Sequence, residues 1–98
     1  MPPFTVLHVC MGNICRSPMA ERLLTLAIRR QAATLLADAP PSAFDPDKLV
    51  HSESAGTGGW HAGEEMNPSA ARQVLARGGD DCGFRARKLR SDLIDAAD

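Results

Sequence analysis

The first apolar run of the chain contains Phe4, Val6, Leu7 and Val9. It has no helical spacing and includes β-branched residues, a pattern typical of a strand buried in a parallel sheet. The run ends at Cys10, where polar and small residues begin. We therefore expect a buried strand at the start of the chain.

Helical spacing begins a few residues later. Gly12 and Asn13 tolerate a positive φ and predict a tight loop. Ser17 is a suitable N-cap, and Pro18 suits the first helical position. We expect the helix to reach residue 35 or 36, with an apolar face made of Ala20, Leu23, Leu24, Ala27 and Ile28. The predicted order is strand, tight loop, helix.

Residues 37–47 interrupt the helical pattern. They hold three prolines and three aspartates, which predicts a surface excursion. A second, weaker strand is expected over residues 49–54, because a parallel strand normally follows a crossover helix. After it, Gly56, Gly58, Gly59 and Gly63 surround Trp60, so this segment is expected to be a loop.

Two shorter helices are expected next. Asn67 and Pro68 predict the start of one, and Gly78-Gly79 predict its end; its inward residues are Ala70, Ala71, Val74 and Leu75. Ser91 is expected to cap a last helical turn. Two strands and two or three helices are too few to cover both faces of a doubly wound sheet. We expect residues 1–98 to form a single domain that is incomplete at its C-terminal end.

Composition narrows the class of protein. Apolar residues make up 44% and charged residues 23%, the usual globular mix. Eleven basic and twelve acidic residues nearly cancel, which leaves no broad positive field for nucleic acid or anionic membranes. The apolar stretch at residues 4–10 is too short to cross a bilayer and lacks the features of a signal peptide. We expect a cytoplasmic protein that binds neither nucleic acid nor membrane.

The cysteines point to reduced thiols. Cys10, Cys15 and Cys82 are an odd and sparse set, unlike the disulfide framework of a small secreted domain. No further ligands follow at zinc-finger spacing. We predict no metal site.

Five residues separate Cys10 from Arg16, between the predicted strand and the predicted helix. Backbone N–H groups of such a loop, with a helix N-terminus behind them, can surround a tetrahedral dianion. A cysteine and an arginine separated by five residues are a short pattern. The alternative explanation is that Cys10 is a buried residue that only packs. We predict that the loop binds phosphate through Met11, Gly12, Asn13, Ile14, Cys15 and Arg16.

This loop also suggests a reaction. The same amides, the helix end and the Arg16 guanidinium favour a thiolate, which lowers the pKa of Cys10 and makes it a nucleophile. Arg16 can offer two parallel donors to phosphoryl oxygens. Ser17 can donate toward the departing thiolate, and Asn13 can fix the loop through hydrogen bonds to backbone. Attack by Cys10 gives a cysteinyl-phosphate that water hydrolyses, without a metal or organic cofactor.

Residues 9–21, Val-Cys-Met-Gly-Asn-Ile-Cys-Arg-Ser-Pro-Met-Ala-Glu, resemble the signature of low-molecular-weight protein-tyrosine phosphatases. Residues 54–63 are similar to the family segment that forms an aromatic wall beside the phosphate loop. The resemblance implies an α/β fold with a three-layer parallel sheet and flanking helices, phosphatase I-like and Rossmann-like, here apparently truncated.

The resemblance also implies roles for single residues. Cys10 is the nucleophile and Arg16 the phosphate ligand, while Ser17 and Asn13 support the loop. Trp60 contacts the substrate ring, although a lone tryptophan is also a common core anchor. Cys15 resembles a second loop cysteine that traps oxidised Cys10 as a disulfide, with simple packing as the alternative.

Two departures from the family pattern concern catalysis. The family takes its general acid from an Asp-Pro loop in the last third of its chain, a region absent here, and Asp45-Pro46 lies in the predicted excursion instead. Phe84 stands where relatives often carry a histidine that supports the loop, and it offers packing only. His61, a loop histidine, is assigned no catalytic part.

The leading hypothesis is a phosphatase that hydrolyses phosphotyrosine in proteins or small aryl phosphates, with inorganic phosphate and vanadate as inhibitors. One alternative is an arsenate reductase of the same fold, in which Cys82 would join a disulfide relay. Another is a catalytically impaired fragment that binds phosphate or regulates a partner.

Overall fold

The structure, a computed structural model, describes residues 4–35 and 50–98. Within these ranges strand β1 spans Phe4–Cys10 and strand β2 spans Val50–Gly56. The helices are α1 (Arg16–Leu35), α2 (Pro68–Ala76) and α3 (Ser91–Ala96). The predicted order of elements is confirmed. The predicted excursion at residues 37–47 lies outside the described residues.

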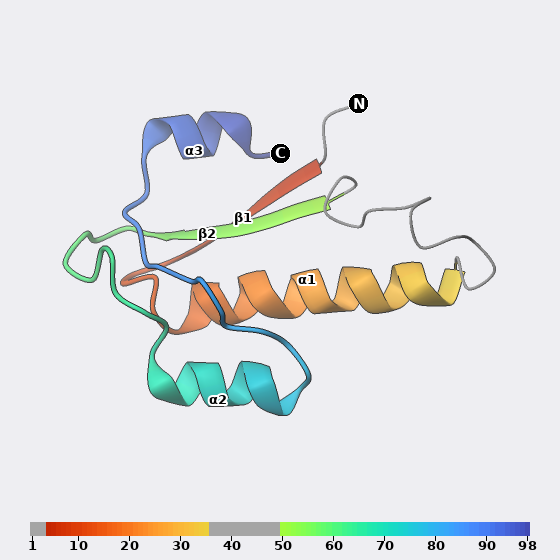
Figure 1. The fold of residues 1–98 in the computed structure, drawn as a ribbon. Helices are drawn as coiled ribbons and strands as arrows, with labels where there is room; N and C mark the ends of the chain where they lie inside the picture. Colours follow the sequence, from red (N-terminus) through yellow and green to blue (C-terminus); the bar gives the residue numbers. More distant parts are fainter. Residues whose placement is uncertain (1–3, 36–49) are drawn as a thin grey trace.

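The two strands are parallel, and their ends coincide. Phe4 pairs with Val50 at one end and Cys10 with Gly56 at the other. Helix α1 packs on one face of this sheet, α3 lies over the other face, and α2 packs against α1 (Figure 1). The arrangement is an α/β fold in three layers with a parallel sheet and flanking helices, as the sequence predicts.

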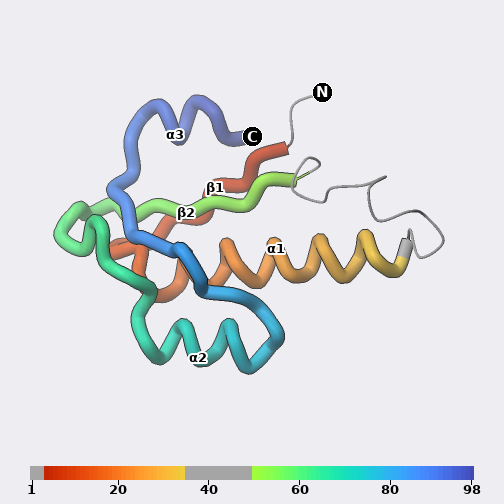
Figure 2. Tube along the Cα trace, viewed as in Figure 1, coloured from red at the N-terminus to blue at the C-terminus, as the bar shows by residue number. Residues whose placement is uncertain are grey.

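The segment between α2 and α3 returns to the end of β2, as the chain trace in Figure 2 shows. There the N–H of Gly56 donates to the Arg87 carbonyl at 2.9 Å, and the N–H of Leu89 donates to the Gly56 carbonyl at 2.7 Å. Lys88 thereby forms a parallel bridge with Gly56. This return brings residues 84–88 beside the loop that follows β1.

The main apolar core lies beside this loop rather than under the middle of the sheet. Its buried members come from α2 and from the segments on either side of it: Met66, Ala70, Val74, Phe84 and Ala86. Ile14 of the loop and Met19 of α1 pack against them. Since a core of close-packed side chains resists displacement, the loop is anchored to the most rigid part of the molecule.

The expectation that the first strand is buried is wrong. Phe4 is 56% exposed and Val9 is 46% exposed. The described residues place one strand beside β1, and its other edge is met by the end of the chain. There the N–H of Asp98 donates to the Thr5 carbonyl at 2.9 Å, while the Thr5 N–H donates to Asp98 Oδ2 at 2.8 Å.

Alternate residues of a parallel strand direct their backbone groups to the same side. Because Thr5 faces away from β2, Leu7 and Val9 also turn their N–H and C=O groups toward this outer edge. Among the described residues, no backbone group outside β2 forms a hydrogen bond with the N–H or C=O of Leu7 or Val9. We call this row of backbone groups, from Thr5 to Val9, the β1 outer edge.

The start of α1 differs from the prediction. The helix begins at Arg16, so Ser17 and Pro18 are its second and third residues rather than its cap and first residue. The Ser17 hydroxyl is engaged with Cys10 and Asn13 instead of the helix end. Pro18 is still tolerated, because the first four N–H groups of a helix need no partner within it. The predicted end, at Leu35, is confirmed.

The shorter helices follow the prediction in part. Asn67 caps α2 as expected, since its Oδ1 accepts from the N–H groups of Ser69 and Ala70 at 2.9 and 3.4 Å. The predicted cap of α3 is wrong, because Ser91 is its first helical residue and the cap position is occupied by Arg90, which makes no side-chain cap bond. Two predicted inward residues, Ala27 and Leu75, are exposed. No helix among the described residues is long and apolar enough to cross a membrane.

Candidate active site

The loop after β1 is held from outside by its carbonyl groups. The carbonyls of Cys10, Met11 and Ile14 accept from the N–H groups of Thr57, Gly58 and Asn67 at 2.9, 2.9 and 2.7 Å. Because these carbonyls point out of the loop, the N–H groups of the loop face its interior. This is the arrangement that forms an anion-binding nest.

Two residues make this close packing possible. Asn13 has φ 57°, the only positive φ of a non-glycine residue in the described ranges, and asparagine tolerates that conformation. Gly56 lies directly behind the loop: a Cβ there would lie 2.9 Å from the Met11 carbonyl oxygen and 3.0 Å from the Asn13 nitrogen. A larger residue at 56 would therefore push the loop away from β2.

Cys10 Sγ lies 3.0 Å from Ser17 Oγ. Burial raises the pKa of the Cys10 thiol, but hydrogen bonds from the Ser17 hydroxyl and from the N–H groups of Ser17, Asn13 and Gly12 outweigh it, so the pKa is below its ordinary value. The predicted lowering of this pKa is confirmed. Its causes are the hydroxyl and the loop amides, since Arg16 is not among them.

Asn13 is the centre of the hydrogen-bond network beneath the loop. It is fully buried. Its Nδ2 donates to Ser17 Oγ and to Ser54 Oγ, each at 2.9 Å, and its Oδ1 accepts from the Arg87 N–H at 2.9 Å. Because Ser17 Oγ already accepts from Asn13, its own proton is available to the sulfur of Cys10.

The network continues away from the loop. Ser54 Oγ donates to Glu21 Oε1 at 2.8 Å, and Glu21 Oε2 accepts from Arg22 Nε at 2.8 Å. The Arg22 guanidinium lies 5.8 Å from the centre of the Phe84 ring, a cation–π distance. Phe84 is buried in the core, so the predicted packing is confirmed, but the contact with Arg22 goes beyond the prediction of packing only.

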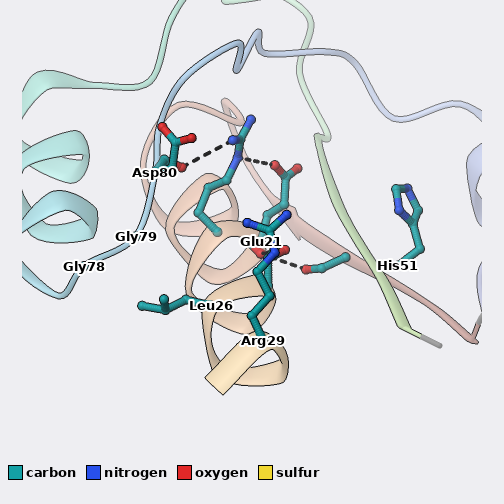
Figure 3. Close-up of a pocket in the computed structure, with 10 residues that line it drawn as sticks. Glu21, Leu26, Arg29, His51, Gly78, Gly79 and Asp80 are labelled. Carbon is teal, nitrogen blue, oxygen red and sulfur yellow. Dashed lines mark hydrogen bonds and ion pairs between the residues drawn. The ribbon is translucent and has the colours of Figure 1, made fainter. Parts of the chain in front are cut away.

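Glu21 also lines the cavity shown in Figure 3, where it lies between Asp80 and His51. The cavity has a volume of about 260 Å³ and is bounded by α1, β2 and residues 78–80, which follow α2. Residues 10–17 do not line it. It is therefore separate from the loop that holds Cys10, and Glu21 lies between the two.

Sequence reasoning missed three supporting residues: Glu21, Ser54 and Arg87. Glu21 closes the first stretch that resembles the family signature, and Ser54 opens the second, so their places in those stretches were a usable signal. Arg87 had none. Its N–H meets Asn13 across 74 positions of sequence, and this contact depends on the return of the chain from α2 to β2.

The other predicted site residues lie at the surface. Arg16, the first residue of α1, is exposed, and its side chain makes no hydrogen bond or ion pair with the described residues. Trp60 is 65% exposed and lies on Gly58, where a Cβ would overlap its ring, so it is no core anchor. Cys15 and Cys82 are exposed free thiols. The phosphate, substrate and redox roles of these residues stay predictions.

Comparison with known proteins agrees with this geometry. Residues 5–98 match the family described as low molecular weight phosphotyrosine protein phosphatase. A low molecular weight protein-tyrosine-phosphatase of Streptomyces coelicolor is 37% identical over 97% of this chain and 53% of its own length. Protein-tyrosine phosphatase A of Mycobacterium tuberculosis is 41% identical over 78% of this chain and 39% of its own length.

Solved structures give the same result. YfkJ of Bacillus subtilis superposes with a TM-score of 0.82 and 30% identity, over 100% of this chain and 54% of its own. The low molecular weight protein tyrosine phosphatase from T. tengcongensis superposes with a TM-score of 0.72 and 29% identity, over 97% of this chain and 54% of its own. The chain spans about half the length of the relatives it matches. With the family match running from Thr5 to Asp98, the chain belongs to the low molecular weight phosphotyrosine protein phosphatase family.

Proposed function

We propose that this chain is a cysteine-dependent phosphatase that hydrolyses phosphotyrosine in proteins or small aryl phosphates. The observation that carries the proposal is the environment of the Cys10 sulfur, which receives hydrogen bonds from the Ser17 hydroxyl and from loop amides. Donors that stabilise a thiolate make it a nucleophile at neutral pH. Residues 1–98 belong to a single domain, and a reduced compartment such as the cytoplasm keeps the thiol active.

The reaction has two steps. Cys10 Sγ attacks phosphorus in line, so the S–P bond forms as the ester P–O bond breaks, and the Ser17 hydroxyl stabilises the thiolate when it later departs. Water then attacks the cysteinyl-phosphate and releases inorganic phosphate. The loop amides of residues 11–16 hold the equatorial oxygens, and the Arg16 guanidinium closes over them as a two-donor fork.

Two exposed side chains complete the proposed site. The Trp60 ring, held on Gly58, offers a flat apolar surface to an aryl leaving group. The exposed thiol of Cys15 captures Cys10 after oxidation to a sulfenic acid, forming a disulfide with loss of water. Inorganic phosphate and vanadate occupy the same loop and inhibit.

The test is hydrolysis of p-nitrophenyl phosphate and of a phosphotyrosine peptide by the wild type and by Cys10→Ser, Arg16→Lys and Cys82→Ser. We expect no turnover above the uncatalysed rate for Cys10→Ser, a loss of about 10²-fold or more for Arg16→Lys because the fork is removed, and unchanged rates for Cys82→Ser. Wild-type protein that reduces arsenate with a thiol donor but hydrolyses neither ester would contradict the proposal.

A further inference from the structure

The Arg22 side chain joins α1 to the segment that follows α2. Its Nη1 donates to the carbonyls of Asp80 and Cys82 at 3.3 and 3.1 Å. Its Nε donates to Glu21 Oε2 at 2.8 Å, and its guanidinium lies 5.8 Å from the centre of the Phe84 ring. The guanidinium is therefore held by two carbonyls, a carboxylate and an aromatic ring.

The ion pair of Arg22 with Glu21 does not follow from helical spacing. Adjacent residues of an α-helix do not face each other, and side chains that pair along a helix are three or four positions apart. Arg22 reaches its neighbour because the two carbonyls and the ring fix the guanidinium beside it. Both side chains are mostly buried, with 22% of Arg22 and 14% of Glu21 exposed. The pair is thus a tertiary contact that water screens little.

The other oxygen of Glu21 is connected to the nucleophile. Glu21 Oε1 accepts the proton of the Ser54 hydroxyl at 2.8 Å, so Ser54 Oγ is left to accept from Asn13 Nδ2. Asn13 Nδ2 also donates to Ser17 Oγ, which leaves the Ser17 proton for the Cys10 sulfur 3.0 Å away. The directions of these hydrogen bonds are therefore set from the Glu21 carboxylate.

Glu21 needs a cationic partner to keep this position. A carboxylate removed from water is stable when it is paired and hydrogen-bonded. Arg22 supplies that partner, while the buried Phe84 ring beside it has no polar atom to offer. Arginine suits the place because it donates through several N–H groups, stacks on aromatic rings and does not lose its proton in proteins. The single ammonium of a lysine cannot make all of these contacts.

We propose that Arg22 is a positioning residue of the candidate active site, which acts on the Cys10 sulfur through Glu21; the inference rests on the proposed function. Arg22 is not among the groups that act on the sulfur directly. It holds the Glu21 carboxylate in place, and the network beneath the loop then keeps the Ser17 proton directed at the sulfur. Without the charge of Arg22 the carboxylate turns toward water, which loosens the hydrogen bond between Ser17 and Cys10.

The test compares Arg22→Met with Arg22→Lys. For Arg22→Met we expect the pH of half-maximal Cys10 alkylation to rise by about half a unit, the effect of weakening one hydrogen bond to the thiolate. The kcat for p-nitrophenyl phosphate should fall about threefold to tenfold, because the departing thiolate is stabilised less. KM should change less than about twofold, because the loop amides still bind phosphate. Arg22→Lys keeps a charge beside Glu21 and should restore most of both losses.

A double-mutant cycle tests whether the effect passes through Glu21. In a Glu21→Gln background Arg22 has no carboxylate to hold, so adding Arg22→Met should move the alkylation pH by less than about 0.2 unit. An equal shift in both backgrounds would show that Arg22 acts by another path, and would overturn the inference.

Arg30→Met is the matched control. Arg30 also lies on α1, and its Nη2 donates to the Arg77 carbonyl after α2 at 2.8 Å. It therefore makes the same kind of bridge without an ion pair to Glu21. Loss of either arginine should lower the melting temperature, whereas only the loss of Arg22 should change the alkylation pH and kcat.

The other outcomes are also decisive. An Arg22→Met protein that loses stability but keeps the wild-type alkylation pH and kcat would make Arg22 a structural bridge only, and would leave the proposed function intact. If Arg22→Met does not fold, Glu21→Gln breaks the same pair from the other side, and an unchanged alkylation pH there overturns the inference. Absence of wild-type hydrolysis would overturn the proposed function, while the alkylation pH would still decide the role of Arg22.

Discussion

At the residue scale, the chemistry depends on one sulfur atom under two opposing influences. Burial of Cys10 disfavours the thiolate, whereas the Ser17 hydroxyl and the amides of Gly12, Asn13 and Ser17 favour it. The hydrogen bonds prevail, and the pKa of Cys10 falls below its ordinary value. Because the folded pKa is lowered, the thiolate persists as the pH decreases until that pKa is reached, and the thiol form dominates below it.

Removing the Ser17 hydroxyl should remove one of the hydrogen bonds that stabilise the Cys10 thiolate. We expect Ser17→Ala to raise the pKa of Cys10, so the pH at which alkylation of Cys10 by iodoacetamide is half maximal moves upward. The measurement is the alkylation rate of the Cys10 peptide, followed by mass spectrometry because Cys15 and Cys82 also react.

Ser91→Ala serves as the control, since Ser91 lies on α3 away from the sulfur. An unchanged midpoint in Ser17→Ala would show that the amides alone set the pKa.

At the scale of elements, the beginning of α2 is tied to the loop. Asn67 caps the helix with its side chain, and its backbone N–H donates to the Ile14 carbonyl at 2.7 Å. One residue thus fixes both the first turn of α2 and one carbonyl of the loop. The packing of α2 in the core therefore also sets the position of the loop.

Loss of this cap should destabilise the fold. We expect Asn67→Ala to reduce the free energy of unfolding by about 1 kcal/mol, because two helical N–H groups lose their acceptor. Urea denaturation measures the change. Ser91→Ala makes a useful comparison: Ser91 makes no cap bond, so a change below about 0.5 kcal/mol is expected. Equal losses in the two variants would contradict the assigned caps.

Much of this arrangement could be predicted from the sequence where the signals are local. The strand before Cys10, the loop with Gly12 and Asn13, and the cap at Asn67 each depend on neighbouring residues. The exposure of Val9 could not be predicted, because an apolar run does not reveal how many strands surround it. The helix cap predicted at Ser17 was wrong, because a serine before a proline also suits other positions of a first turn, whereas the predicted contact of its hydroxyl with the Cys10 sulfur is confirmed.

The candidate site shows the same division. Its proposed reacting groups, Cys10 and Arg16, lie within or beside one short loop and were predicted from their spacing between a strand and a helix. Its supporting residues come from β2, α1 and the returning segment, so the contacts of Ser54 and Arg87 with Asn13 exist only after the chain has folded.

At the scale of the whole molecule, the loop and the main core form one unit. Ile14 packs against the core, and Asn13 joins α1, β2 and the segment after α2 through its side-chain hydrogen bonds. A ligand in the loop therefore binds the native chain and has no equivalent site in the unfolded chain. Binding of this kind raises the apparent stability by mass action.

Vanadate should therefore stabilise the protein. At about one hundred times its dissociation constant we expect about 2.7 kcal/mol of added stability, which raises the melting temperature by about 10 °C or more for a chain of this size. A thermal-shift experiment measures it, with Arg16→Ala as the control that should respond far less. No shift of the wild type at millimolar vanadate would show that the loop does not bind the anion.

The β1 outer edge affects how the protein behaves at high concentration. Its backbone groups at Leu7 and Val9 lie next to the exposed side chains of Phe4 and Ile94, and such an edge readily pairs with another strand. In a protein made of residues 1–98 alone, every copy presents the same edge, so a high protein concentration favours self-association and dilution opposes it.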